Sequence, residues 1–428
     1  KQILPNPSCL FYWNLKKFVL SIIFFLFVNL GVAQSSGIFE SYAILSFNGG
    51  ANEYFDMQAS TGNTDLQGAN FGTATIGTTS LVVKGGQNKT YKNGGCNINS
   101  STIFYRVYKT GDAPGAFASI SELFLANLPN PGDQSWEGTS GSTNLILGLT
   151  PGSYTLEMYS SANFDSCGTG THFSNNSGAN YKATFTVVGP ISVTSTTGTA
   201  TTATYANVAS AITAINGGVL HTGTIVCSVP SGYTEMAPVG GFAITASGTA
   251  SNTISFVKTG AGTNPIFTAN SSLISGTLTD AVFKIIGGDY ITIDGFTMLE
   301  NSANTITTEA SNNMTEFGIA LFYASTTNGC QNVTIKNNSI DLNRFYQNTI
   351  GIYAHSKHTA TNVTTSATAT GPNGGNHNLS ITANAITDVN QGILVFGPTA
   401  AADHNNGLVI GGSSADANTI TNFGTTGT

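Results

Sequence analysis

The sequence is poor in charged residues. Only 8% of its 428 residues are Asp, Glu, Lys or Arg, and its formal net charge at pH 7 is −7. Ordinary soluble domains carry roughly 25% charged residues. A nucleic-acid-binding protein needs a basic face, which this chain has too few Lys and Arg to build. Gly, Ser, Thr and Asn are abundant instead, which favours an extracellular, β-rich protein whose surface consists of hydroxyl and amide groups.

Cysteine is also scarce, and none of the five cysteines has a CxxC or Cys/His spacing that would indicate zinc. Cys96 and Cys167 both lie in polar segments rich in Gly, Asn and Ser. In an oxidising compartment these two can form a disulfide. We expect Cys227 to be a buried, small apolar residue and Cys330 to lie in a loop.

One apolar run stands near the N-terminus, over residues 18–30. It is shorter than the roughly 20 residues that a membrane-spanning helix needs. Lys16 and Lys17 precede it, and Gly31-Val-Ala33 places small residues before a cleavage point. We therefore predict a signal peptide over residues 1–33, a mature chain that starts at Gln34 without a membrane span, and a secreted or cell-surface location.

A short strand pattern recurs in the C-terminal half. Its copies are ITIDGFTM from Ile291, VTIKNNSI from Val333, LSITANAI from Leu379 and a degenerate copy over residues 408–420. A second pattern lies between them, as GIALF from Gly318, GIYAH from Gly351 and GILVF from Gly392. Apolar residues at every second position predict strands with one buried face. No copy can bury that face alone, so the copies must stack as a solenoid.

An asparagine stands two residues before an isoleucine in three copies, at Asn338, Asn384 and Asn418. Asn tolerates left-handed backbone angles, so we expect a bend at the same place in each coil, with these side chains in one stack. The pattern resembles the Asn ladders of the right-handed parallel β-helix in the pectin-lyase-like superfamily. That resemblance implies such a β-helix over residues 204–428. Because the first Met is Met57, we expect a fragment or a translated frame with an unusual start codon. Because the chain ends just after a coil, we also expect that it is truncated at its C-terminus.

Residues 34–189 lack the repeat. Alternating segments separated by turns rich in Gly, Asn and Pro predict an antiparallel β-sandwich there. The expected strands are 42–47, 80–84, 102–108, 119–125, 144–147, 153–159 and 183–188. The segments that begin at Ser41, Lys84, Gln134 and Ser174 resemble the N-terminal module of large secreted surface proteins of Bacteroidota. The resemblance implies export through outer-membrane secretion machinery if a sorting domain follows Thr428.

A segment rich in Thr, Ser, Gly and Ala, over residues 190–203, is predicted to be a linker. A helix then follows, with Thr204 as its expected N-cap and Gly217-Gly218 at its end. Its apolar face consists of Val208, Ala211, Ile212 and Ile215. We expect this helix to cover the open first coil of the solenoid. The expected strands of the first coils are 224–229, 242–246, 253–258 and 282–286.

The solenoid offers little that is typical of catalysis. Pectate-lyase-like relatives hold calcium with clustered Asp residues beside an Arg or Lys base, and glycosidases of this fold use paired Asp. Asp294, Asp341 and Asp388 lie on separate coils, and Arg344 is the only arginine in the solenoid. We expect Asp294 to pair with Lys336 across two coils. We predict no catalytic residue, no metal ligand and no cofactor, calcium being the only one that the resemblance allows.

The histidines of the solenoid are similarly uninformative. His355 and His358 stand at the end of a strand, and His377 lies in a segment rich in Gly and Asn. A metal could be held by two histidines at this spacing on a helix, but not as readily at a strand end. We expect all three to be solvated loop histidines.

The second pattern predicts a ligand-binding face. If Ile319 and Leu321 point inward, alternation turns their neighbours outward. Stacked coils then present Phe322, Tyr353, His355 and Phe396 on one face. Aromatic faces suit sugar rings, so a polysaccharide or a cell-surface glycan is the expected ligand. Residues 356–378 and 397–407 can fold over this stripe, and we expect this covering because an open apolar patch promotes aggregation.

These patterns predict a secreted or cell-surface structural or adhesion protein that binds polysaccharide through its β-helix and has no enzymatic activity. The alternative is a polysaccharide lyase or a glycoside hydrolase of the pectin-lyase-like fold. Its active site would then lie in the loops or in sequence outside residues 1–428. Glycoside hydrolysis needs two carboxyl groups roughly 5–9 Å apart, and the sequence does not require such a pair.

Overall fold

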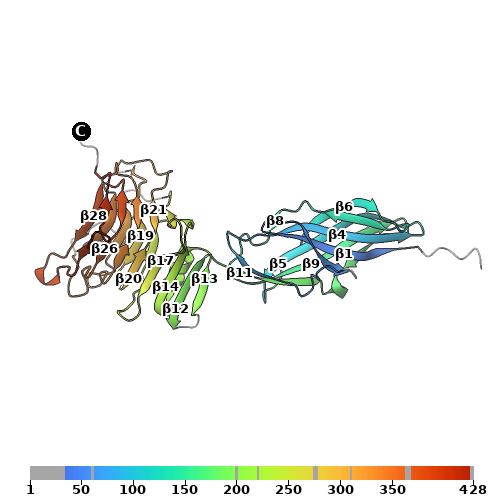
Figure 1. The fold of residues 1–428 in the computed structure, drawn as a ribbon, viewed down its shortest axis with the longest axis horizontal. Helices are drawn as coiled ribbons and strands as arrows, with labels where there is room; N and C mark the ends of the chain where they lie inside the picture. The colour runs from blue at the N-terminus through green and yellow to red at the C-terminus, as the bar shows by residue number, and fades with distance from the viewer. Residues whose placement is uncertain are drawn as a thin grey trace, which may run out of the picture. The chain divides into compact units, whose positions relative to one another are not determined.

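The computed structural model describes residues 34–424, apart from 59–61, 198–200, 219–220, 273–277, 309–310 and 362–367. The expected signal peptide, residues 1–33, lies outside the described residues. The described chain is almost entirely β structure, and α2 is the only α-helix within it. It divides into an N-terminal unit that ends at Val187 and a C-terminal unit that begins at Val188 (Figure 1).

The N-terminal unit is built from antiparallel strands. They are β1 (Ser35–Phe47), β2 (Glu53–Gln58), β3 (Asn70–Thr75), β4 (Leu81–Asn93), β5 (Asn97–Lys109), β6 (Ala118–Asn127), β7 (Gln134–Gly138), β8 (Thr143–Asn144), β9 (Gly152–Asp165), β10 (Gly170–Ser174) and β11 (Tyr181–Val188), with a 3₁₀ turn η1 (Asn176–Gly178). Their hydrogen-bonded order is β2-β1-β4-β7-β6-β5-β9-β11-β3, with β8 beside β4 and β10 beside β9. Alternate residues of these strands meet in one apolar core, which includes Leu45, Val83, Ile103, Leu156 and Phe185.

Six of the seven strands expected in this unit coincide with parts of β1, β4, β5, β6, β9 and β11. The prediction of a strand over 144–147 is wrong beyond Asn144. The side-chain oxygen of Asn144 accepts the backbone N–H of Ile146 at 3.1 Å. This local bond starts a turn, which is the usual competition between Asn side chains and strand pairing. Strands β2, β3, β7 and β10 were not predicted.

The C-terminal unit stacks its strands in three sheets. The first sheet contains, in order, β13 (Thr202–Tyr205), β12 (Ile191–Thr197), β14 (Thr222–Pro230), β17 (Ile254–Thr259), β20 (Ile291–Asp294), β23 (Thr334–Lys336), β26 (Ser380–Thr382) and β29 (Val409–Ile410). The second contains β15 (Thr234–Met236), β18 (Ile266–Thr268), β21 (Thr297–Leu299), β24 (Ser339–Asp341), β27 (Ala385–Thr387) and β30 (Thr419–Ile420). The third contains β16 (Phe242–Ile244), β19 (Ala281–Ile286), β22 (Phe317–Phe322), β25 (Ile350–His355) and β28 (Gln391–Phe396), followed by a 3₁₀ turn, η3 (Ala401–Asp403).

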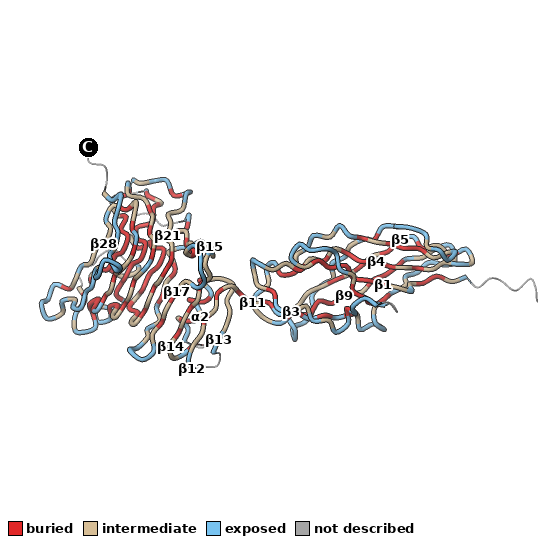
Figure 2. Tube along the Cα trace, in the orientation of Figure 1, coloured by how far each residue is buried: buried red, intermediate tan, exposed pale blue. Residues whose placement is uncertain are grey.

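Successive coils add one strand to each sheet, and all pairs from β14 onward are parallel. This is the arrangement of a β-helix-like solenoid, and its interior is a continuous buried core (Figure 2). The predicted register is confirmed, because Ile293 pairs with Ile335 and Ile335 with Ile381. All three isoleucines are fully buried. The four strands expected in the first coils also lie on β14, β16, β17 and β19.

The prediction of a linker at 190–203 is wrong. Strands β12 and β13 form an antiparallel hairpin there, and β12 also pairs with β14 of the first coil. Ile191 and Val193 alternate with polar residues and are fully buried in the solenoid core. Thr and Val are good strand formers, so a composition that looks like a linker here forms the start of a sheet.

Helix α2 (Val208–Gly217) buries the four predicted apolar residues against the first coils, so it covers that end of the core as expected. The N-cap is Asn207, whose side chain accepts the N–H of Ser210 at 2.8 Å, and not Thr204, which lies in β13. Glu235 adds a second cap, because its carboxylate accepts the N–H groups of Val208 and Ala209 at 2.7 and 3.1 Å. Gly218 ends the helix in a left-handed conformation, with φ of 60°.

The asparagine ladder is present. Nδ2 of Asn338 donates to Oδ1 of Asn384 at 3.1 Å, and Nδ2 of Asn384 donates to Oδ1 of Asn418 at 2.9 Å. The expectation that the ladder asparagines themselves adopt left-handed backbone angles is wrong, however. The left-handed residues are Asn337 and Ala383, each one position before a ladder residue. The bend therefore turns the ladder side chains inward, where Asn338 and Asn384 are almost fully buried.

Candidate functional site

The third sheet brings together the residues expected to bind a ligand. Phe322 pairs with His355, and His355 with Phe396, in one column of the sheet. Tyr353 lies in the neighbouring column, next to Ala320. The inward residues of the same strands, such as Ile319, belong to the solenoid core, whereas Phe322 and Tyr353 join a separate apolar cluster on the outer face.

This outer face is mostly closed. Phe322 is fully buried and Tyr353 is 5% exposed, while Phe396 is 43% exposed. Phe317 stacks on the ring of Tyr353 at 4.2 Å between centroids. His355 is half-buried, and its ring stacks on that of Phe396 at 4.3 Å. Only the end of the stripe formed by His355 and Phe396 can therefore meet a ligand in this structure.

His358, which follows β25, provides much of the cover. Its Nδ1 lies 2.7 Å from the hydroxyl of Tyr353, and its ring is 4.9 Å from that of Phe322. The expectation of solvated loop histidines is wrong, because His358 and His377 are 1% and 8% exposed. Burial lowers the pKa of both His355 and His358 to about 4, so these two rings are neutral at physiological pH.

A buried acidic group lies at the start of the same strands, and sequence reasoning missed it. Oε2 of Glu316 accepts the N–H of Asp280 at 2.9 Å, and Oε1 accepts the hydroxyl of Tyr346 at 3.2 Å. Burial, reinforced by the charge of Asp280, raises the pKa of Glu316 to about 8. Lys284 is also buried, and burial lowers its pKa despite the attraction of Asp280 and Glu316. In the sequence, this buried charged cluster could have been recognised from Lys284, a lysine at an outward position of the apolar strand 282–286.

The acidic residues of the repeats form two different arrangements. Asp294 and Lys336 make the expected ion pair at 3.4 Å, and both side chains remain partly exposed. Such a pair contributes roughly 0–1 kcal/mol. Asp341 and Asp388 lie on adjacent coils, because Asp341 pairs with Thr387, the residue before Asp388. Burial, and then the charge of Asp388, raises the pKa of Asp341.

Arg344 joins the second arrangement through an amide. Its Nη1 donates to the side-chain oxygen of Asn422, whose Nδ2 donates to Asp388. Calcium takes six to eight oxygen ligands, and two carboxylates do not form such a set. Among the residues that the structure describes, no group of three or more His, Cys, Asp or Glu side chains could hold a metal ion.

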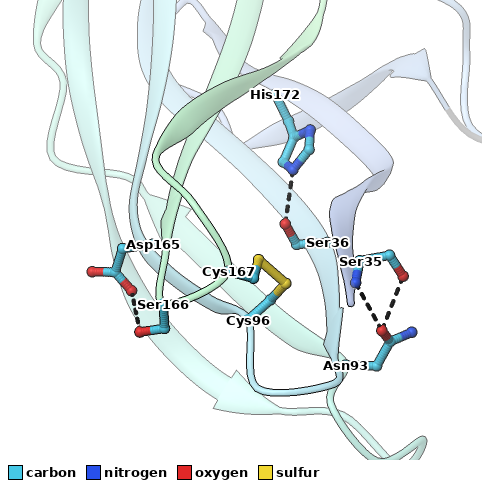
Figure 3. Close-up of a disulfide and its surroundings, with 8 residues drawn as sticks. All are labelled: Ser35, Ser36, Asn93, Cys96, Asp165, Ser166, Cys167 and His172. Carbon is cyan, nitrogen blue, oxygen red and sulfur yellow. Dashed lines mark hydrogen bonds between the residues drawn. A yellow bond between two sulfur atoms is a disulfide. The ribbon is translucent and has the colours of Figure 1, made fainter. Parts of the chain in front are cut away.

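Cys96 and Cys167 form a disulfide in the N-terminal unit (Figure 3). Nearby, the hydroxyl of Ser36 lies 2.8 Å from Nε2 of His172, which ties β1 to β10. Cys227 and Cys330 are free and fully buried. Burial raises the pKa of both thiols to about 12, which makes them unreactive core residues.

No protein family, curated protein or solved structure matches the chain. Function must therefore be argued from the residues and their geometry. Within the part of the chain that the structure describes, no helix is long and apolar enough to cross a membrane.

Proposed function

We propose that this chain is a secreted or cell-surface structural and adhesion protein. In this proposal the N-terminal unit is an antiparallel β-sandwich, and the solenoid is a right-handed parallel β-helix of the pectin-lyase-like kind. The observation that carries the proposal is the outer face of the third sheet, which is closed over Phe322 and Tyr353 and open at Phe396. An enzyme needs acid and base groups that converge in an accessible cleft, whereas Glu316 is fully buried beneath Tyr346.

The open end of the stripe supports polysaccharide as the ligand of the solenoid. His355 holds the Phe396 ring in a parallel stack, with an angle of 4° between the ring planes. A braced and partly exposed aromatic ring is suited to packing against a sugar ring. Phe322 and Tyr353 act behind it as packing residues and do not touch the ligand.

An extracellular location is supported by two features. The disulfide between Cys96 and Cys167 is stable in an oxidising compartment. The N-terminal run with its preceding lysines has the pattern of a signal peptide. The resemblance to Bacteroidota surface proteins makes outer-membrane secretion machinery the proposed export route.

A second candidate function is that of a polysaccharide lyase or glycoside hydrolase. The neighbouring carboxyl groups of Asp341 and Asp388, with Arg344 linked to Asp388 through Asn422, favour it. Paired carboxyl groups are what glycoside hydrolysis uses.

Export and ligand binding can be tested with the full chain expressed in a bacterium that exports proteins. N-terminal sequencing should find Gln34 as the first residue, and retention of residues 1–33 would contradict secretion. The protein should bind a polysaccharide array, and Phe396→Ala should weaken that binding. Phe345→Ala is the matched control, because Phe345 is 57% exposed and lies outside the stripe. Release of new reducing ends that Asp388→Asn abolishes would favour the enzyme instead.

A further inference from the structure

The N-terminal unit carries a cluster of aromatic rings on the outer face of the sheet formed by β5, β9 and β10. Phe104 and Tyr159 are direct cross-strand partners, and their rings stack at 4.6 Å with 5° between planes. Phe117 meets Tyr159 edge-on at 4.9 Å, and Phe173 leans on it at 6.3 Å. We call these four residues the aromatic platform. Ile103, beside Phe104 in β5, points into the core, so the platform faces away from it.

The platform is held in place by an ion pair between Arg106 and Glu157, which lie opposite each other on β5 and β9. Arg106 donates to the two carboxylate oxygens of Glu157 at 3.1 and 2.9 Å, and to the carbonyl of Gly115 at 3.0 Å. Its guanidinium lies over the Phe117 ring, 4.0 Å from the centroid. Glu157 also accepts hydrogen bonds from Tyr108 at 3.0 Å and Asn180 at 2.7 Å. Both charges are thus neutralised, and they fix the rings above them.

Polar side chains flank the other side of the platform. The hydroxyl of Thr171 donates to Oδ1 of Asn163 at 2.7 Å, and Nδ2 of Asn163 donates to the hydroxyl of Ser100 at 2.9 Å. Thr171 and Asn163 are exposed and pair with each other, and Phe173 stands two residues further along β10, opposite Ser161. Phe173 is 54% exposed, which makes it the ring most accessible to a ligand.

We propose that the aromatic platform binds a neutral polysaccharide, with Phe173 packed against a sugar ring and Asn163 and Thr171 bonded to its hydroxyl groups. The opposite charges of Arg106 and Glu157 cancel each other, so the pair offers no net charge to a phosphate, a uronic acid or a nucleic acid. Asn163 and Thr171 bond to each other and keep further donor and acceptor capacity, which sugar hydroxyl groups can use and an apolar protein partner cannot. A sugar polymer satisfies both the rings and the polar groups, and the platform crosses several strands.

Affinity electrophoresis of the full chain tests this proposal, in gels that contain mixed-linkage β-glucan, mannan or polygalacturonate. At least one of the two neutral polymers should retard the protein. Phe173→Ala should weaken that retention roughly fivefold or more, as expected for the loss of one aromatic contact. Phe39→Ala is the matched control, because this phenylalanine of β1 is 36% exposed and lies outside the platform. Phe173→Ala should leave the melting temperature unchanged.

Three results would overturn the proposal. One is that neither neutral polymer retards the protein, and another is that only polygalacturonate does. The third is equal retention of the wild-type protein and Phe173→Ala, with Asn163→Ala also without effect. Phe396→Ala separates this site from the proposed solenoid site, since it should leave retention by the platform intact. Loss of binding in Phe396→Ala alone would support the solenoid site and contradict this one.

Discussion

The hydroxyl of Tyr353 lies 2.7 Å from Nδ1 of His358, and this contact closes the outer face of the third sheet. The hydrogen bond pairs two polar atoms that would otherwise be buried without partners. It also holds the His358 ring against Phe322. Strand alternation turns Phe322 and Tyr353 away from the solenoid core. In the structure they nevertheless form a second, smaller core on the outer face of the sheet.

Truncation of Tyr353 should reveal this second core. Tyr353→Ala should lower the free energy of unfolding by roughly 3–5 kcal/mol, as for other buried aromatic side chains. Tyr353→Phe keeps the ring but removes the hydrogen bond, and should cost about 1–3 kcal/mol. Phe396→Ala should cost less than about 1 kcal/mol, because that ring is 43% exposed. The free energies of unfolding can be measured by chemical denaturation. If Tyr353→Ala and Phe396→Ala lowered them by equal, small amounts, the stripe would be open to solvent.

Glu122 should make the stability of the N-terminal unit depend on pH. It is 3% exposed, with a hydrogen bond from the Ser101 hydroxyl, and burial raises its pKa to about 8. A folded-state pKa above the ordinary value of 4.5 means that the folded state keeps the proton longer than the unfolded state. The contribution of Glu122 to the free energy of unfolding is therefore fully present below pH 4.5 and is lost as the pH rises toward 8.

The variant Glu122→Gln keeps the shape of the protonated acid and cannot ionise. It should be close to the wild-type protein in stability at pH 4.5 and more stable at pH 8, by roughly 1–4 kcal/mol. Thermal melts of the full chain at several pH values measure the difference. Glu53→Gln, which removes an exposed carboxyl group of β2, is the control. If the wild-type protein instead became more stable relative to Glu122→Gln as the pH rises, that result would contradict the raised pKa of Glu122.

Much of the solenoid could be predicted from sequence, because alternation with period two reports which face of a strand is buried. The stack of Ile293, Ile335 and Ile381 and the buried face of α2 follow from that pattern alone. Alternation says nothing about what covers the opposite face. Covering of the stripe by residues 356–378 was expected from the aggregation risk of an open apolar patch, but the burial of His358 was missed because its segment has no periodicity.

Contacts between coils were predictable only where the residues share a register. Asp294 and Lys336 occupy equivalent positions, and their pairing was expected. Asp388 is offset by one position from Asp341, since Thr387 is the residue that pairs with Asp341. Asp388 also has a positive φ of 48°, which departs from strand geometry. Its approach to Asp341 therefore depends on a local bend that the alternation pattern does not encode.

The asparagine ladder should contribute strongly to the stability of the solenoid. Asn384 is 1% exposed, and its Nδ2 donates to the carbonyl of Ile335 at 2.9 Å as well as to Asn418. Asn384→Ala would leave the Ile335 carbonyl and the Asn338 side chain, buried groups of the preceding coil, without this partner, at a cost of roughly 2–4 kcal/mol. Lys336→Ala, which removes only a partly exposed ion pair, should cost about 1 kcal/mol or less. Equal losses in urea unfolding would argue against the ladder.

In the first sheet, substitutions at neighbouring positions should differ most sharply in their effect on stability, because one side chain points into the core and the next points out. Ile335 is fully buried between Ile293 and Ile381, whereas Thr334 points out of the same strand. Ile335→Asp would bury a charge without a partner and should unfold the solenoid. Thr334→Ala removes a partly exposed hydroxyl and should change stability by no more than about 0.5 kcal/mol. Thermal melts monitored by circular dichroism distinguish the two, and similar tolerance at both positions would mean that the coils stack in a different register.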